Sequence, residues 1–223
     1  SENPSVLRSG ESFDSEFILH PGRDDWQIYQ EPEPRHQYIV SVDTAHGVED
    51  VDFSCIQVLD RIGRVQVAEY YSRTPPNIVA EQARLVATFY NNAVLVPEVD
   101  GPGIAVIKEL LDSGYVNLWV RSITATNWTQ RFGFRTQAKD MRDGIIAALA
   151  KAIRLGTHTF NSTRLLNECK VFIENSNGRC ESMPGEHDDA VMAIAIAIYV
   201  DSTLEDAAIS EPVNKEVIAR DNV

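Results

Sequence analysis

The segment that decides the fold spans residues 37–72 and reads QYIVSVDTAHGVEDVDFSCIQVLDRIGRVQVAEYYS. It contains three runs rich in β-branched and aromatic residues, at 38–43, 53–60 and 64–72, and this composition is typical of β-strands. Only a tight turn around Gly63 separates the last two runs, which predicts a hairpin. Short connections between all three runs favour an antiparallel three-strand meander.

The chain after this meander alternates between predicted helices and strands. Apolar residues at helical spacing predict helices, and short apolar runs predict strands. Because parallel neighbours need crossover helices, we expect the later strands to lie parallel. The sequence predicts an α/β fold of the ribonuclease H-like type, a mixed sheet in which the antiparallel meander is extended by parallel strands, with helices on both faces. The predicted helices cover 74–92, 101–115 and 136–156, and the strands between them cover 93–100 and 116–120.

The predicted helix at 136–156 has Thr136 as its N-cap and Gly156 at its C-terminal end. The stretch 164–184 is expected to form a helix followed by a small hairpin. A final helix follows from Asp188, in the stretch EHDDAVMAIAIAIYV.

Composition and punctuation divide the chain into three parts. Residues 1–36 are Ser/Glu-rich and end near a Pro-punctuated EPEPRH, so we expect a leader or linker. Residues 37–201 form the expected folded domain, and 202–223 an acidic flexible tail. With 43% hydrophobic residues the chain can bury a sizeable core, and no apolar run reaches the roughly 18 residues that a membrane span needs, so no membrane partner is expected.

Four carboxylates stand at the ends of apolar segments. Asp43 ends the first strand, Glu98 follows the apolar run AVLV, and Asp188 and Asp189 precede the final apolar helix. If the first and fourth strands are neighbours, Asp43 and Glu98 lie at adjacent strand ends, and a packed helix can bring the Asp pair to them. Converging carboxylates repel one another unless cations hold them. Hard oxygen ligands select Mg²⁺ or Mn²⁺, and two such ions bridged by Asp43 would support phosphodiester hydrolysis.

Each of these residues also has a purely structural interpretation. Asp43 could start an Asx-turn, Glu98 could be an exposed strand end, and one Asp of the pair is expected to serve as helix N-cap. His187 is expected to support the site from behind its ligands or to touch the substrate phosphate. Asp100 is a rival to Glu98, although the following Gly-Pro pair suggests a role in a turn.

The charge of the chain is unevenly distributed. A net charge of −13 and a pI near 4.8 argue against a polyanionic partner. From 121 to 154, however, seven basic residues face two acidic ones. This basic stretch is either a solvated helix face or a surface that contacts phosphate groups. The candidate DNA contacts within it are Arg121, Arg131, Arg135, Lys139 and Arg142.

Four motifs in series resemble a known family. YIVSVDTAHGVEDVDFSCIQVLD has an Asp at the end of the first strand, a Gly soon after, and Asp-x-Ser at the next strand. VPEVDGPG has an acidic residue before a Gly turn, FGFRT has a Gly-Phe-x-Thr pattern, and EHDDAVMAIAIA has a His-Asp-Asp helix start. Over roughly residues 26–200 the chain resembles the nuclease domain of the large terminase subunit of tailed bacteriophages. The matching positions include Asp43, Gly47, Asp52, Ser54, Gly133, Phe134 and Thr136.

The resemblance implies an endonuclease that cuts concatemeric double-stranded viral DNA during genome packaging. It implies Asp43, Glu98 and the Asp188/Asp189 pair as ligands of Mg²⁺ or Mn²⁺. The sequence has no GxxxxGK[ST] phosphate loop, so we expect the ATPase motor to lie in a preceding part of a longer protein. Expected partners are DNA, that motor, the portal and the small terminase subunit, in the host cytoplasm at the procapsid.

Other functions are compatible with the same fold, because a fold alone does not select a substrate. The chain could be a junction resolvase, a transposase or an RNA–DNA hybrid nuclease. It could also be a non-catalytic acidic module that docks on a portal-type partner. An ATPase of this fold would need Gly-rich phosphate loops, which the sequence lacks.

Overall fold

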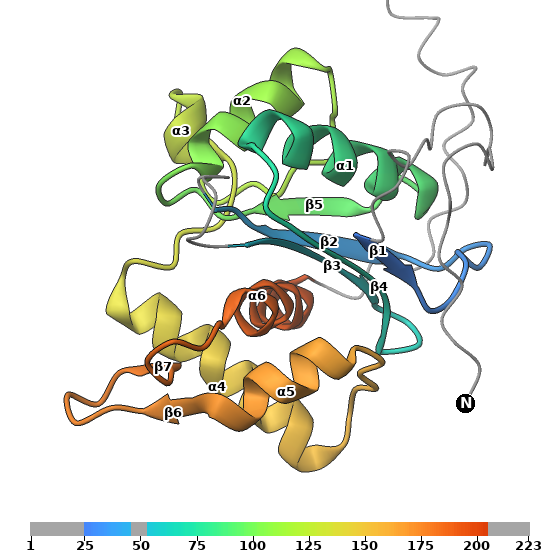
Figure 1. Ribbon diagram of the computed structural model, residues 1–223. Helices are drawn as coiled ribbons and strands as arrows, with labels where there is room; N and C mark the ends of the chain where they lie inside the picture. The colour runs from blue at the N-terminus through green and yellow to red at the C-terminus, as the bar shows by residue number, and fades with distance from the viewer. Residues whose placement is uncertain (1–24, 46–52, 205–223) are drawn as a thin grey trace, which may run out of the picture.

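The computed structural model describes residues 25–45 and 53–204. Within them, a five-stranded sheet with the order β1-β4-β3-β2-β5 forms the centre of the molecule (Figure 1). The predicted meander is confirmed, since β3 pairs antiparallel with both β2 and β4. β5 lies parallel to β2, as expected for a strand that follows a crossover helix. The strands are β1 (Trp26–Ile28), β2 (Tyr38–Asp43), β3 (Ser54–Asp60), β4 (Val65–Ser72) and β5 (Val94–Pro97).

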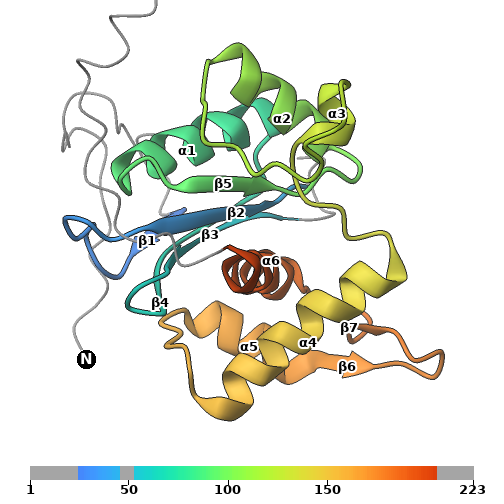
Figure 2. The same cartoon turned by 180° about the vertical axis from the view of Figure 1, so that it is seen from behind.

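Helices cover both faces of this sheet, which confirms the predicted ribonuclease H-like α/β architecture (Figure 2). One face carries α1 (Pro76–Phe89), α2 (Gly103–Asp112) and the short α3 (Trp128–Arg131). The other face carries α4 (Lys139–Leu155), α5 (Thr163–Val171) and α6 (Asp189–Thr203). None of the described helices combines the length and the apolar character that crossing a membrane requires.

α6 lies between the sheet and the layer formed by α4 and α5 (Figures 1 and 2). Every residue from Ala190 to Ile198 is at most 4% exposed. A helix enclosed on all sides has no polar face, and this explains the unbroken apolar run. The hydroxyl of Ser41 on β2 donates to the carbonyl of Ala193 at 2.6 Å, so α6 is tied to the sheet by a buried hydrogen bond as well.

The expected boundary of the domain at residue 37 is wrong, because β1 lies within the predicted linker. Trp26 is 2% exposed, and its Nε1 donates to Oε1 of Gln82 on α1 at 2.7 Å. The remainder of the predicted leader, residues 1–24, lies outside the described residues. At the other end α6 continues to Thr203, so the predicted tail begins inside a helix, and residues 205–223 again lie outside the described part.

Two further predictions need correction. Residues 116–120 form isolated bridges, Leu118 to Leu95 and Val120 to Phe132, instead of a strand, because the chain turns back through α3. α4 begins at Lys139 with Ala138 as N-cap, so the predicted N-cap at Thr136 is wrong. The Thr136 hydroxyl donates to Glu98 instead. Gly156 ends α4 in the left-handed conformation, as predicted.

The stretch after α4 also behaves as predicted. α5 is followed by an antiparallel hairpin of β6 (Phe172–Glu174) and β7 (Cys180–Ser182). This hairpin leads directly to the His-Asp-Asp sequence before α6.

Candidate functional site

The carboxyl ends of β2 and β5 meet at one edge of the sheet because the two strands are parallel neighbours. Asp43 is the last residue of β2, and Glu98 directly follows β5, where its N–H donates to the carbonyl of Val42 at 2.8 Å. The two side chains share a hydrogen bond, and both residues are half-buried. The predicted pairing of Asp43 with Glu98 is therefore present.

The start of α6 brings two more carboxylates to this edge. Asp188 and Asp189 both act electrostatically on Asp43. Nη2 of Arg142 lies 3.3 Å from Oδ2 of Asp188, and the hydroxyl of Tyr71 donates to Oδ2 of Asp189 at 3.1 Å. We refer to Asp43, Glu98, Asp188 and Asp189 as the carboxylate cluster.

Burial and mutual repulsion change the acidity of the cluster. Burial, then the charges of Glu98, Asp189 and Asp188, raise the pKa of Asp43 well above its usual range. Burial also raises the pKa of Glu98, although its hydrogen bond with Asp43 and the charge of Arg142 oppose that rise. In the absence of another cation, the cluster therefore favours bound protons.

Glu168 on α5 caps α6, a role for which the sequence suggested one of the two Asp residues. Its Oε2 accepts hydrogen bonds from the N–H groups of Ala190 at 2.8 Å and Val191 at 3.2 Å. Asp188 occupies the N-cap position but makes no cap hydrogen bond through its side chain. Capping therefore does not explain the Asp pair. Glu168 was not predicted, because a cap from another helix leaves no local pattern in the sequence.

Replacing Glu168 by Ala is expected to lower the free energy of unfolding by about 1–2 kcal/mol, the usual cost of losing a helix cap. Glu168→Gln keeps an acceptor for the helix N–H groups and should cost less. Burial raises the pKa of Glu168 to about 7, so its stabilising contribution is complete near pH 4 and falls as the pH rises through 7. Urea unfolding of both variants at pH 5 and pH 8 measures this. Equal losses for Ala and Gln would contradict the capping role.

Asp100 and Thr136 support Glu98. Oδ2 of Asp100 accepts from the backbone N–H groups of Thr136 at 2.7 Å and Gln137 at 2.8 Å. The Thr136 hydroxyl donates to Glu98. Asp100 thus fixes a neighbouring segment and is not a substitute for Glu98 in the cluster.

Residue 103 must be a glycine because of its close approach to the backbone of Glu98. A Cβ atom at this position would lie 1.7 Å from the carbonyl oxygen of Glu98.

An aromatic wall borders the cluster on the side of Asp189. Nδ1 of His187 lies 3.6 Å from Oδ2 of Asp189, and its ring meets the Phe53 ring edge-on with centroids 5.3 Å apart. Phe53 in turn stacks on Tyr71 with centroids 4.4 Å apart. His187 is therefore held beside the cluster, close to the position that the sequence suggested.

The predicted basic contacts are dispersed. Arg121 is half-buried and donates from Nη2 to the carbonyl of Thr129 at 2.8 Å, Arg131 lies over the ring of Phe132, and Nε of Arg135 is 3.5 Å from Asp100. Lys139 and Arg142 line a hollow of about 300 Å³ next to Thr136. Of the five, only Arg142 pairs with a member of the cluster.

The motif residues between the first two predicted strands are only partly described. Gly47 and Asp52 lie outside the described residues, whereas Ser54 begins β3 and its Oγ accepts from the N–H of Ala45.

No metal-binding group is ready-made within residues 25–45 and 53–204, because no three His, Cys, Asp or Glu side chains are already arranged to hold an ion. The donor set nevertheless suits a hard divalent cation, since four carboxylates offer only oxygen atoms. The raised pKa values of Asp43 and Glu98, which have burial as their largest cause, are consistent with a position that a cation would neutralise.

Comparison with solved structures identifies the fold. A large terminase nuclease from thermophilic phage G20c with bound magnesium aligns with a TM-score of 0.64, at 19% identity, over 79% of this chain and 87% of that one. The chain has the fold of phage large-terminase nucleases. The cobalt-bound form of that nuclease gives the same values. The large terminase nuclease domain of Thermus phage P74-26 aligns with a TM-score of 0.61, at 20% identity, over 78% of this chain and 85% of that one. No family model matches the sequence, and no curated protein does either.

Proposed function

We propose that this chain is the nuclease domain of a large terminase subunit, a metal-dependent endonuclease that cuts concatemeric double-stranded viral DNA during packaging. The observation that carries the proposal is the convergence of Asp43, Glu98 and the Asp188/Asp189 pair in this fold. The large terminase nuclease of phage G20c, which has the same fold, was solved with magnesium, with cobalt and with zinc bound. The carboxylate cluster is thus the proposed catalytic centre.

The carboxylate cluster (Asp43, Glu98, Asp188 and Asp189) would hold Mg²⁺ or Mn²⁺, and the proposed number of ions is two. Bound at this position, the ions would lower the pKa of a water molecule and neutralise charge on the leaving oxygen. Asp43 supplies a carboxylate from a central strand, Arg142 holds Asp188, and Tyr71 orients Asp189. Asp100 and Thr136 fix the Glu98 carboxylate, and His187 stands beside Asp189.

The assembly around this domain is also part of the proposal. An ATPase motor in the same longer protein, the portal and the small terminase subunit would hold the DNA, in the host cytoplasm at the procapsid. This division of labour suits a net charge of −13, because an acidic domain binds DNA weakly by itself.

Cleavage of supercoiled plasmid in Mn²⁺, Mg²⁺, Ca²⁺ and EDTA tests the proposal. We expect cleavage by the wild type in Mn²⁺ or Mg²⁺ only, and loss of cleavage in Glu98→Ala and Asp189→Ala. Lys108→Ala, an exposed change on α2, is the control and should cleave normally. Cleavage restricted to RNA–DNA hybrids or four-way junctions would favour another nuclease of this fold. No cleavage by the wild type, together with portal binding that depends on Asp43, would favour the docking module.

A further inference from the structure

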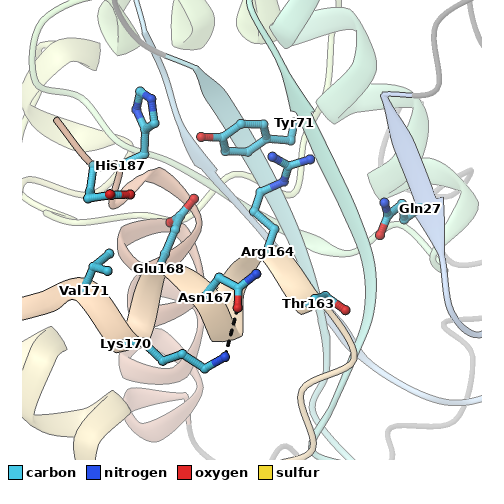
Figure 3. Close-up of a pocket in the computed structure, with 10 residues that line it drawn as sticks. Gln27, Tyr71, Thr163, Arg164, Asn167, Glu168, Lys170, Val171 and His187 are labelled. Atoms are coloured by element: carbon cyan, nitrogen blue, oxygen red, sulfur yellow. Dashed lines mark hydrogen bonds between the residues drawn. The ribbon is translucent and has the colours of Figure 1, made fainter.

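A groove of about 910 Å³ is lined by side chains from β1, β4, α5 and the segment before α6 (Figure 3). Tyr71 and His187, which both approach Asp189, stand at one end of it. The groove continues along α5, where Arg164 and Lys170 contribute cationic side chains. It therefore begins at two residues that contact Asp189 and extends over a part of the surface that lies outside the basic stretch between 121 and 154.

Arg164 is held in a fixed orientation within this groove. Its guanidinium carbon lies 3.8 Å from the centroid of the Tyr71 ring, and Nε donates to Oε1 of Glu69 at 3.4 Å. The Glu69 side chain is 1% exposed, whereas that of Arg164 is 42% exposed. In the described part of the chain its one hydrogen bond uses Nε, so the two terminal nitrogens keep their donors available. A guanidinium oriented in advance loses little entropy when it binds a phosphate.

The remaining lining is suited to a sugar–phosphate backbone. Lys170 is exposed and its Nζ donates to Oδ1 of Asn167 at 3.0 Å (Figure 3). Thr163 and Gln27 add neutral polar groups. Of the two acidic residues, Glu168 is directed to the N–H groups of α6, and Glu186 is exposed on the segment before it. Lysine, arginine and neutral polar side chains are the groups that contact DNA phosphates and sugars.

We propose that this groove binds the phosphodiester backbone of the DNA strand next to the cleavage position, with Arg164 as a pre-oriented phosphate contact and Lys170 as a second one. The inference rests on the proposed nuclease function and adds where the substrate lies. Such contacts position DNA without reading its sequence. With these contacts the DNA strand lies along α5, in addition to any contact with the basic stretch between 121 and 154.

The test is the salt dependence of duplex DNA binding, followed by fluorescence anisotropy in Ca²⁺ to prevent cleavage. Between roughly 50 and 200 mM salt, each lost phosphate contact decreases the absolute value of the slope of log K against log[salt] by about 0.9. We expect that decrease for Arg164→Gln and for Lys170→Gln, and about twice that decrease for the double variant. Lys108→Gln makes the same charge change on the opposite face of the sheet and should keep the wild-type slope.

Arg164→Gln also removes the cationic partner of buried Glu69. Lys170→Gln changes only an exposed side chain and therefore decides the question if the first variant does not fold. Wild-type slopes in the folded variants, or no DNA binding by the wild type, would overturn the groove proposal. Plasmid cleavage by the wild type is scored separately, so a groove that fails while cleavage persists leaves the nuclease proposal standing.

Discussion

Asp43→Asn is expected to abolish cleavage and, in the absence of metal, to raise the melting temperature. Changing residues that merely support a metal ligand costs about 10- to 100-fold in affinity or activity, so loss of a ligand should exceed that. Without metal the same carboxylate destabilises the folded chain when it is ionised, because burial and its three acidic neighbours raise its pKa. Removing one charge relieves that repulsion. Each kcal/mol gained shifts the melting temperature of a chain of this size by roughly 2–4 °C.

The pH dependence of this effect has a definite sign. The pKa of Asp43 is higher in the folded than in the unfolded chain, so the folded state binds more protons as the pH passes from the usual value to the raised one. Stability without metal therefore falls as the pH rises through that window. Because Mn²⁺ replaces protons, its stabilising effect should be larger at pH 8 than at pH 5.

Thermal unfolding of the wild type and Asp43→Asn, with Mn²⁺ or EDTA at both pH values, measures all three effects. Asp112→Asn, an exposed change on α2, is the control and should behave like the wild type in all three respects. An Asp43→Asn protein that still gains stability from Mn²⁺ like the wild type would contradict the proposed ligand role.

A chain that starts at residue 37 is expected not to fold, whereas one that starts at residue 25 should fold. The short β1 contributes two core side chains, Trp26 at 2% and Ile28 at 3% exposure, and covers Tyr70 on β4, whose ring centroid is 5.1 Å from that of Trp26. Truncating one buried Trp alone costs about 3–5 kcal/mol. Whole domains are stable by only about 5–15 kcal/mol, so loss of the strand removes most of the margin.

Circular dichroism and urea unfolding of the two truncated chains test this prediction. Trp26→Phe in the longer chain retains an aromatic ring but loses the donor to Gln82, and should be only partly destabilised. Equal stability of the two truncated chains would show that β1 is dispensable.

Local patterns in the sequence were sufficient for the parts of the fold that depend on them. The alternation in residues 38–43 predicts β2 with its boundaries, and the apolar run after Asp189 predicts a buried α6. β1 was missed because three residues between a polar leader and a Pro-rich segment show no periodicity. Its burial is decided by β4 and α1, which are distant in sequence.

For the candidate site as well, local sequence patterns predicted some residues and long-range contacts decided the others. The positions of Asp43 and Glu98 followed from strand ends in the sequence, and the structure brings both together with the Asp pair. Thr136 was misassigned because a Thr before a helix is typical of a cap, and its bond with Glu98 depends on the folded chain. Glu168 and Arg164 act across helix and sheet contacts, for which a single sequence offers no periodic signal.

The enclosure of α6 between Ala190 and Ile198 has a consequence for how the molecule opens. This part of the helix is buried on every side and joined to β2 through Ser41, so its amide protons should exchange with solvent only in global unfolding events. Strain at its first turn therefore cannot be relieved by fraying. Repulsion among the acidic side chains therefore lowers the free energy of unfolding of the whole cooperative unit.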